Sequence, residues 1–271
     1  MEVHFYGVAW ITGLLVGAAS GLRVVAGRRT VDWRTYGAFA CGFVGMILGA
    51  KWQYRLEFLP WPAAIAMPPG SLLAGGERTP LAVAMGAAFA ALWCAWWRLP
   101  WRHLGDGLAF GAMVGLSLGR VGCIVNGCCL GRVCPTSLAS LCIMPPPGSQ
   151  AFMAQMGASG LAHPMPVVPL SILFSLVGWC IVAVLWTQLR RGAPPGRLLA
   201  IACLAAPLAK AGLELLRDEP RPPGLMIGLP LAAAACTILV LVGQRRAPGI
   251  IARRRMSAQP GAQDRGRTAA G

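Results

Sequence analysis

Long apolar stretches limit the fold of this sequence more than any other feature. Of its 271 residues, 56% are hydrophobic and only 12% are charged, a balance that is unusual for a soluble globular domain. A run of about 18 apolar residues crosses the roughly 30 Å hydrocarbon core of a membrane as a helix, because each residue adds about 1.5 Å. About seven such runs occur, at Phe5–Gly21, Tyr36–Tyr54, Leu81–Trp97, Gly107–Val125, Val167–Trp186, Leu198–Leu216 and Pro222–Val242. The sequence therefore predicts an all-α, polytopic membrane helix bundle with about seven transmembrane helices.

The basic residues predict how this bundle is oriented. The chain has 24 Lys and Arg residues against 9 Asp and Glu residues, a net charge of +15. Most of the basic residues fall in every second connection, at 23–34, 98–102 and 190–197, and in the C-terminal tail. Because short loops rich in Lys and Arg stay in the cytoplasm, we expect the N-terminus outside and the C-terminus inside. The same distribution explains the charge without nucleic acid as a partner.

The chain divides into a membrane domain and a tail. We expect a transmembrane domain over residues 1–243, with an outward-facing insertion at about 127–166 that is rich in Pro and Cys. Residues 244–271, rich in Arg, Gly, Ala and Pro, predict a basic, disordered cytoplasmic tail.

Two polar stretches lie at the outward ends of predicted spans. In "AKAGLELLRDEPRPPG", the residues Lys210, Glu214 and Arg217 are spaced so that a helix presents all three on one face. An ionisable group at membrane depth costs several kcal/mol unless it is paired or hydrated, so such residues commonly mark a functional site. The alternative is an interfacial salt-bridge cluster that only anchors the helix.

The second polar stretch is "LGRVGCIVNGCCLGRVC". Arg120 lies near the end of the fourth predicted span, and Gly122, Gly127 and Gly131 allow the helix to break there. A pocket formed by Arg120, Lys210, Arg217 and Arg132 suits a phosphate headgroup, while Glu214 could orient the cations or accept a proton. No Rossmann or Walker motif is present, so no nucleotide cofactor is indicated.

These stretches resemble a known family. "GRVGCIVNGCCLGR" is similar to the signature of the prolipoprotein diacylglyceryl transferases, Gly-Arg-x-Gly-Asn-Phe-x-Asn-Gly-Glu followed shortly by Gly-Arg. "FYGVAWITGLLVG" resembles the start of the family's first span, "MILGAKWQYRL" the end of its second, and "KAGLELLRDEP" its Arg-x-x-x-Glu-Phe-x-Arg-x-Pro motif. The resemblance extends over about Phe5–Val242.

The resemblance implies a multi-pass enzyme of the bacterial inner membrane without a cofactor or metal. Such an enzyme transfers the diacylglyceryl group of phosphatidylglycerol to the cysteine thiol of a prolipoprotein signal peptide, with release of glycerol phosphate. Four residues fall on positions implied to be catalytic: Arg120, Glu214, Lys210 and Tyr6. Five fall on or beside positions implied to bind substrate: Asn126, Arg217, Arg132, Cys128 and Cys123.

Several positions depart from the family pattern. Cys123 replaces the first signature asparagine, Cys128 replaces the signature glutamate, and Lys210 stands where the family has arginine. The family's His-Gly-Gly motif is missing, with Pro80 at the position of the histidine. Two alternatives therefore stay open. One is a paralogue with cysteine-based redox or other lipid-transfer chemistry, and the other is a non-enzymatic lipid-binding protein.

The clustered cysteines have several possible roles. Cys123, Cys128, Cys129 and Cys134 are predicted to face the oxidising side of the membrane, where disulfides persist. A disulfide such as Cys128 with Cys134 is one interpretation, and a thiol active in acyl or redox chemistry is another. A third is that cysteine is simply tolerated in an apolar context. A metal site is disfavoured, because adjacent cysteines rarely bind one tetrahedral ion.

Overall fold

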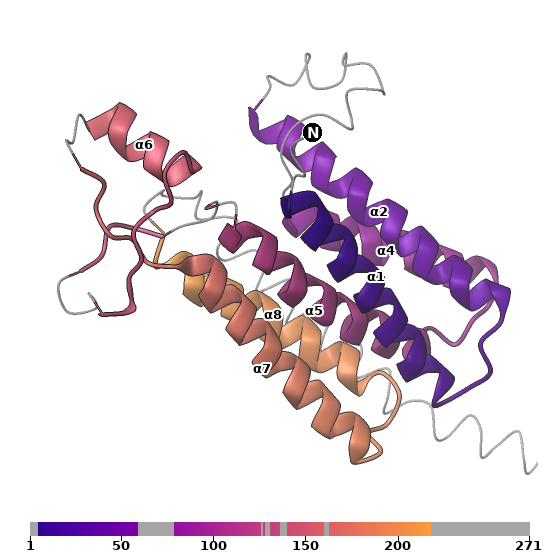
Figure 1. The fold of residues 1–271 in the computed structure, drawn as a ribbon. Coiled ribbons are helices and arrows are strands. Elements are labelled where there is room, and N and C mark those ends of the chain that lie inside the picture. Colours follow the sequence, from indigo (N-terminus) through magenta and orange to yellow (C-terminus); the bar gives the residue numbers. More distant parts are fainter. Residues whose placement is uncertain are drawn as a thin grey trace, which may run out of the picture.

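The computed structural model describes residues 5–58, 79–125, 127, 131–135, 140–159 and 163–217, and these residues form helices and loops without a strand. The helices are α1 (Phe5–Ala26), α2 (Trp33–Phe58), α4 (Thr79–Trp96), α5 (Trp101–Val125), α6 (Gln150–Ser159), α7 (Leu170–Arg190) and α8 (Arg197–Glu214), shown in Figure 1. The predicted all-α class is confirmed. Every helix except α6 coincides with one of the first six predicted spans. The seventh predicted span and the tail lie outside the described residues.

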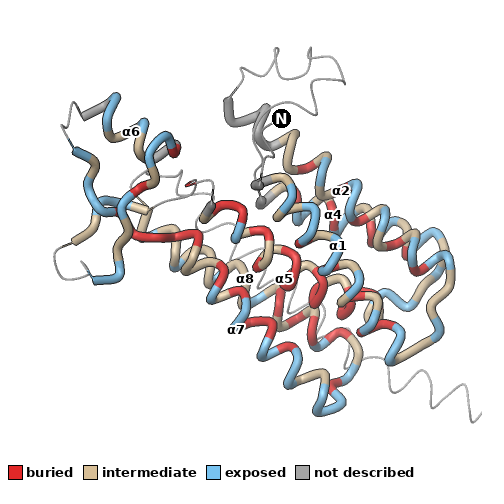
Figure 2. The backbone as a smooth tube through the Cα atoms, in the orientation of Figure 1, coloured by how far each residue is buried: buried red, intermediate tan, exposed pale blue. Residues whose placement is uncertain are grey.

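Three of the described helices are long and apolar enough to cross a membrane. They are Gly7–Ala26, Trp101–Ile124 and Leu170–Arg190, and Leu81–Trp96 is a shorter apolar helix. Figure 2 shows exposed residues along the outward sides of the helices, and many of them are large and apolar, with Leu15 66%, Leu92 68% and Leu176 56% exposed. Lipid tails are the solvent that suits such a surface.

Glycines bring α1 and α5 into close contact. A Cβ atom at Gly17 would lie 2.5 Å from the carbonyl oxygen of Gly111, and one at Gly21 would lie 2.5 Å from that of Gly107. Small residues at every fourth position let two helix backbones approach until they touch, which maximises dispersion contacts where no hydrophobic effect operates. The two helices run antiparallel, because Gly13 faces Gly115.

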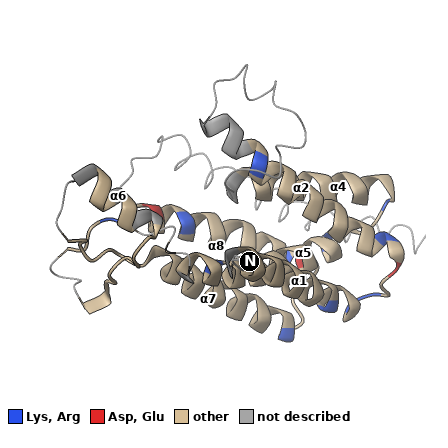
Figure 3. Cartoon of the chain, turned by 45° about the horizontal axis from the view of Figure 1, so that its top comes forward, with Lys and Arg blue, Asp and Glu red and all other residues tan. Residues whose placement is uncertain are grey.

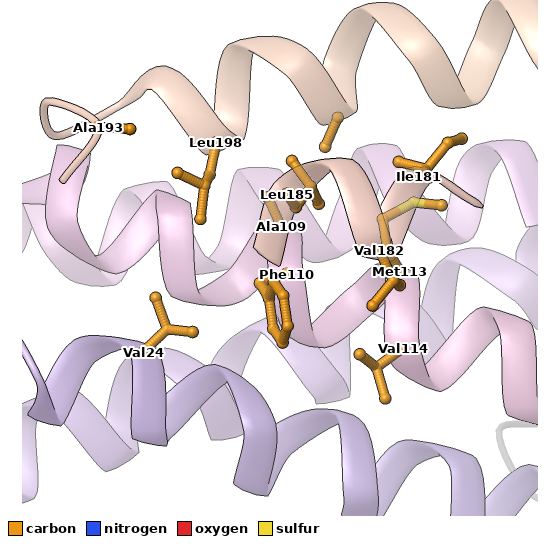
Figure 4. Packing of buried hydrophobic residues seen from close by; sticks show 11 residues of the cluster. Val24, Ala109, Phe110, Met113, Val114, Ile181, Val182, Leu185, Ala193 and Leu198 are labelled. Carbon is orange, nitrogen blue, oxygen red and sulfur yellow. The ribbon is translucent and has the colours of Figure 1, made fainter. Parts of the chain in front are cut away.

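Helix α5 lies at the centre of a second set of contacts, with α7 and α8. Figure 4 shows the apolar cluster that joins them to α1. Its members are Val24, Ala109, Phe110, Met113, Val114, Ile181, Val182, Leu185, Ala193, Leu198 and Ala202. Further along α5, the hydroxyl of Ser175 donates a hydrogen bond of 2.9 Å to the carbonyl of Ser117, which ties α7 to α5. Helices α2 and α4 form a second antiparallel pair, packed through Gly45 and Gly49, and this pair contacts α1 and α5 through a cluster of Val25, Ala38, Cys94 and Leu104.

A buried carboxylate connects α5 to α8 and to the loop after α1. Helix α5 begins six residues before the expected span, so Asp106 lies within it, and this residue is fully buried. Its Oδ2 atom is 2.6 Å from the Arg28 guanidinium and accepts a 2.9 Å hydrogen bond from the amide of Gly196, while Oδ1 accepts one of 2.9 Å from Leu199. No side chain of α8 caps its own first turn. Asp106 therefore caps α8 from another helix, where the helix dipole also favours a negative charge.

We call this end of the bundle the capped end. The connections at 27–32 and 191–196 meet here, because Arg28 also donates a 3.0 Å hydrogen bond to the carbonyl of Ala193. Asp32 accepts hydrogen bonds from the hydroxyl and the amide of Thr35, which begin α2 and lower the pKa of the Asp32 carboxyl. The described charged residues lie toward helix ends (Figure 3), so the middle of the bundle stays apolar.

The first prediction concerns the glycine contact between α1 and α5. Replacing Gly17 with Ala places a methyl group against the Gly111 carbonyl, and we expect the overpacked crossing to lose about 1–3 kcal/mol. Thermal unfolding in detergent is the measurement. Gly7→Ala on the same helix is the control, because nothing lies within 4 Å of a Cβ atom there. Equal melting temperatures for the two variants would contradict the packing argument.

The second prediction concerns the buried carboxylate. Asp106→Ala leaves the partly buried Arg28 without its counter-ion and two amides of α8 without an acceptor. We expect a loss of about 3 kcal/mol, since breaking a buried pair leaves an uncompensated charge. The Arg28→Met/Asp106→Leu double variant removes both charges and should lose less than the single variant. A single variant as stable as the native protein would refute the proposed cap.

Candidate active site

Two cations surround one carboxylate at the C-terminal end of α8, opposite the capped end. The Glu214 side chain is only 7% exposed, its Oε1 atom lies 3.9 Å from Lys210 Nζ, and its Oε2 atom lies 3.5 Å from Arg217 Nη1. The predicted common face is therefore present. Both ion pairs are part of the described structure, so Glu214 lies between two cations.

Arg120 reaches this end of the bundle from α5. Its guanidinium lies 4.9 Å from the centre of the Phe174 ring on α7, which is a cation–π contact. Stacking of this kind fixes the orientation of the planar guanidinium. Its N–H groups lie in the plane of the group, so they can still donate hydrogen bonds at its edge. Phe174 was not predicted as a site residue, because one aromatic residue in an apolar span carries no sequence signal.

The backbone of the segment after α5 is hydrogen-bonded to the backbone at the end of α8. The amide of Arg132 donates a 3.0 Å hydrogen bond to the carbonyl of Leu216, and its carbonyl accepts one of 3.1 Å from Val168. Gly131 fits closely here, since its Cβ atom would lie 2.8 Å from the Leu216 oxygen. The Arg132 side chain itself is exposed. Two motifs that are far apart in the sequence thus meet at one end, which we call the site end.

The cysteines are arranged differently from the expectation. Cys134 forms a disulfide with Cys142, so the suggested pairing of Cys128 with Cys134 is wrong. The sequence offered no basis for choosing Cys142, because the pairing depends on how the insertion folds back along 166–168. Cys123 is 1% exposed within α5, which separates its thiol from any reactant arriving from solvent.

Other predicted site residues fall partly or wholly outside the described structure. Tyr6 lies in the first turn of α1, but its side chain is outside the described residues, as are Asn126 and Cys128. Pro80 is the second residue of α4, a position in the first helical turn that suits proline.

The chemistry of the site end follows from its charges. Arg120, Lys210 and Arg217 bring three positive charges to one end of the bundle, and Glu214 supplies one negative charge in return. Guanidinium and ammonium groups near a low-dielectric environment bind phosphate oxygens strongly. The arrangement can hold an anion and stabilise negative charge that develops on it.

The fold and the site end together define a helical membrane protein with a cationic site at one end of its bundle. The chain belongs to the prolipoprotein diacylglyceryl transferase family, whose sequence model matches residues 1–245. This confirms the resemblance seen in the motifs and identifies the class of enzyme as a transferase.

Two relatives agree with this assignment. A phosphatidylglycerol–prolipoprotein diacylglyceryl transferase from Acidiphilium cryptum (strain JF-5) is 33% identical over 159 residues, which is 54% of either chain. The match therefore spans about half the length of that relative. A protein of the same name from Paracidovorax citrulli (strain AAC00-1) is 23% identical over 273 aligned positions, covering 90% of this chain and 89% of its own.

The third prediction tests the coupling within the α8 cluster. Glu214→Gln leaves Lys210 and Arg217 facing each other without their shared counter-ion, so we expect a lower melting temperature than that of the native protein. In a double-mutant cycle with Lys210→Met, the coupling between Lys210 and Glu214 should be about 0.5–1 kcal/mol. A coupling of zero would show that this ion pair contributes nothing to stability.

Proposed function

We propose that this protein is a phosphatidylglycerol–prolipoprotein diacylglyceryl transferase. It moves the diacylglyceryl group of phosphatidylglycerol to the cysteine thiol of a prolipoprotein signal peptide. The observation that carries the proposal is the convergence of Arg120, Lys210 and Arg217 at one end of a membrane-type helix bundle. The family membership and the names of both relatives support it.

The reaction requires a charged leaving group to be stabilised. The substrate thiolate attacks the carbon of the diacylglyceryl group that is bonded to a phosphate oxygen. A C–S bond forms, and the bond between that carbon and the phosphate oxygen breaks. Glycerol phosphate then departs with one more negative charge than the phosphodiester had. In the proposed mechanism Arg120, Lys210 and Arg217 stabilise this charge, because hydrogen bonds aimed at developing charge strengthen as the charge grows.

The thiol proton also needs an acceptor, since the thiolate rather than the thiol is the nucleophile. Glu214 is the proposed acceptor, because it is the one acidic residue in the sequence between Gly107 and Arg217. Its ion pairs with Lys210 and Arg217 hold the carboxylate beside the cations proposed to bind the phosphate, close to where the thiol would react. The proposed site is completed by five residues that rest on the motif resemblance alone: Tyr6, Asn126, Arg132, Cys123 and Cys128.

The proposed topology has seven transmembrane helices in the bacterial inner membrane, with the N-terminus outside and the C-terminus inside. The capped end then faces the cytoplasm, and the basic residues of its loops support this orientation. The Cys134–Cys142 disulfide supports an outward-facing site end, because disulfides persist in oxidising compartments. Residues 1–243 are the proposed transferase domain, with the insertion at about 127–166 outside and residues 244–271 as a cytoplasmic tail.

The departures from the family pattern define the competing functions. A redox paralogue would use an accessible thiol in place of the missing histidine and glutamate, but Cys123 is buried. A non-enzymatic lipid-binding protein would keep the cationic end without turnover. Transfer of the diacylglyceryl group to a prolipoprotein thiol in a direct assay separates the proposed transferase from a paralogue with redox or other lipid-transfer chemistry and from a lipid-binding protein.

The fourth prediction is the activity test. Cells depleted of their own diacylglyceryl transferase should recover lipidation of a test lipoprotein, seen as a gel shift, when this chain is expressed. Arg120→Ala should lower kcat/KM for phosphatidylglycerol by about 100-fold or more, as for loss of one group that stabilises developing charge. Arg190→Ala, at the capped end, is the matched control and should leave the activity unchanged.

Lys210 offers a further check within the same assay. Lys210→Arg restores the two-pronged geometry with which guanidinium binds phosphate, so its activity should equal or exceed that of the native chain. Good membrane expression without any modified lipoprotein would overturn the proposed function.

A further inference from the structure

We propose that the Cys134–Cys142 disulfide is a positioning element for the site end, so that correct assembly of the site depends on oxidation of these two cysteines. For its effect on activity this inference rests on the proposed function. Its structural part does not, because it concerns where the backbone of 131–134 is held.

The disulfide closes a small backbone assembly that we call the clip, made of 131–134, 142–143 and 166–168. Val167 lies in the middle, paired with Val133 on one side and with Ile143 on the other. The amide of Ile143 donates a 3.1 Å hydrogen bond to the Val167 carbonyl, and the Val167 amide returns one of 2.9 Å. The amide of Cys134 donates one of 2.9 Å to Pro166. The two cysteines thus hold the two outer segments on either side of the central one.

The clip is connected directly to the cationic site. On its 131–134 segment, Arg132 donates to Leu216, which lies between Glu214 and Arg217 in the chain. On its 166–168 segment, the chain continues into α7, where Phe174 stacks on the Arg120 guanidinium. The clip is therefore the one described connection that reaches the exit of α5, the start of α7 and the end of α8 together.

Among the described residues, few other interactions stabilise this part of the chain, chiefly two hydrogen bonds between the Gln155 side chain and the backbone of Met165. Its pairings are isolated bridges rather than a sheet, and the sequence has no Asp, Glu, Lys or Arg between Val133 and Leu189 that could form ion pairs. Leu141 is 67% exposed and Met153 is 62% exposed, so the described part of the insertion buries few large side chains. A loop-rich element with so small a core depends on a covalent cross-link to limit its unfolded states.

Breaking the disulfide should loosen the clip and leave the helices packed. A dithiol such as dithiothreitol reduces the disulfide by supplying two electrons and two protons, and is itself oxidised to a cyclic disulfide. Cys134 and Cys142 then become two thiols. The segment 131–134 loses its constraint, and the cations around Glu214 lose the backbone support at Leu216.

The experiment uses the full chain in vesicles of phosphatidylglycerol and phosphatidylcholine, with and without dithiothreitol. Hydrogen exchange of peptides containing Arg132 and Val168 should become about tenfold faster on reduction, while exchange in α1 near Gly17 stays constant. The KM for phosphatidylglycerol should rise about tenfold with a smaller change in kcat, since positioning of the cations is lost rather than the groups themselves.

Two variants complete the design. Cys134→Ser/Cys142→Ser should behave like the reduced native chain and show no further response to dithiothreitol. Cys180→Ser, which removes an exposed thiol on α7, should respond as the native chain does. Alkylation and mass measurement report the state of both cysteines in each sample.

The outcomes separate the two proposals. Unchanged exchange at Arg132 after complete reduction would overturn the positioning role, whatever the activity. Faster exchange with an unchanged KM would overturn the link between the clip and the site. Absence of transfer in the oxidised native chain would count against the proposed function, and the exchange data would still decide whether the clip depends on the disulfide.

Discussion

The contact of Asp106 with the first turn of α8 determines how the rest of the molecule is aligned. A buried carboxylate is costly unless it is fully paired, and this one is satisfied by Arg28 and by two amides of α8. Sliding α8 along α5 by one turn would break these bonds together. The register between the two helices is therefore fixed by electrostatics, whereas the apolar contacts between them tolerate small shifts.

This register has a consequence at the other end of the bundle. Arg120 lies 14 residues after Asp106, and Lys210 lies 14 residues after Gly196. The two helices run parallel and each residue adds about 1.5 Å, so both cations lie about 21 Å from the capped end, at the same depth. Glu214 follows one turn later. The contact of Asp106 with α8 at the capped end thus places Arg120 and Lys210 at the same depth near the opposite end of the bundle.

Much of this arrangement could be predicted from the sequence. The features that could not be predicted are contacts between segments that are distant in the chain. The positions of six helices follow from apolar runs, and the common face of Lys210, Glu214 and Arg217 follows from helical periodicity, which holds wherever a helix packs. The roles of Asp106 and Phe174 depend on which helices become neighbours, and no local pattern encodes that. The disulfide partner of Cys134 depends on a pairing through Val167, which lies more than 30 residues away in the chain.

The departures from the family pattern fall both inside and outside the helices whose register is fixed. Pro80 lies in the first turn of α4, which packs against α2, and Cys128 follows α5 in the chain. Cys123 and Lys210, by contrast, lie within α5 and α8. Arg120, Lys210 and Glu214 lie within α5 and α8, whose register the buried carboxylate holds. The groups proposed to stabilise the leaving phosphate are therefore positioned by the most constrained part of the bundle. A reaction whose main demand is stabilisation of a charged leaving group depends chiefly on that part, because misplacing a cation weakens its effect on the transition state more than on the bound lipid.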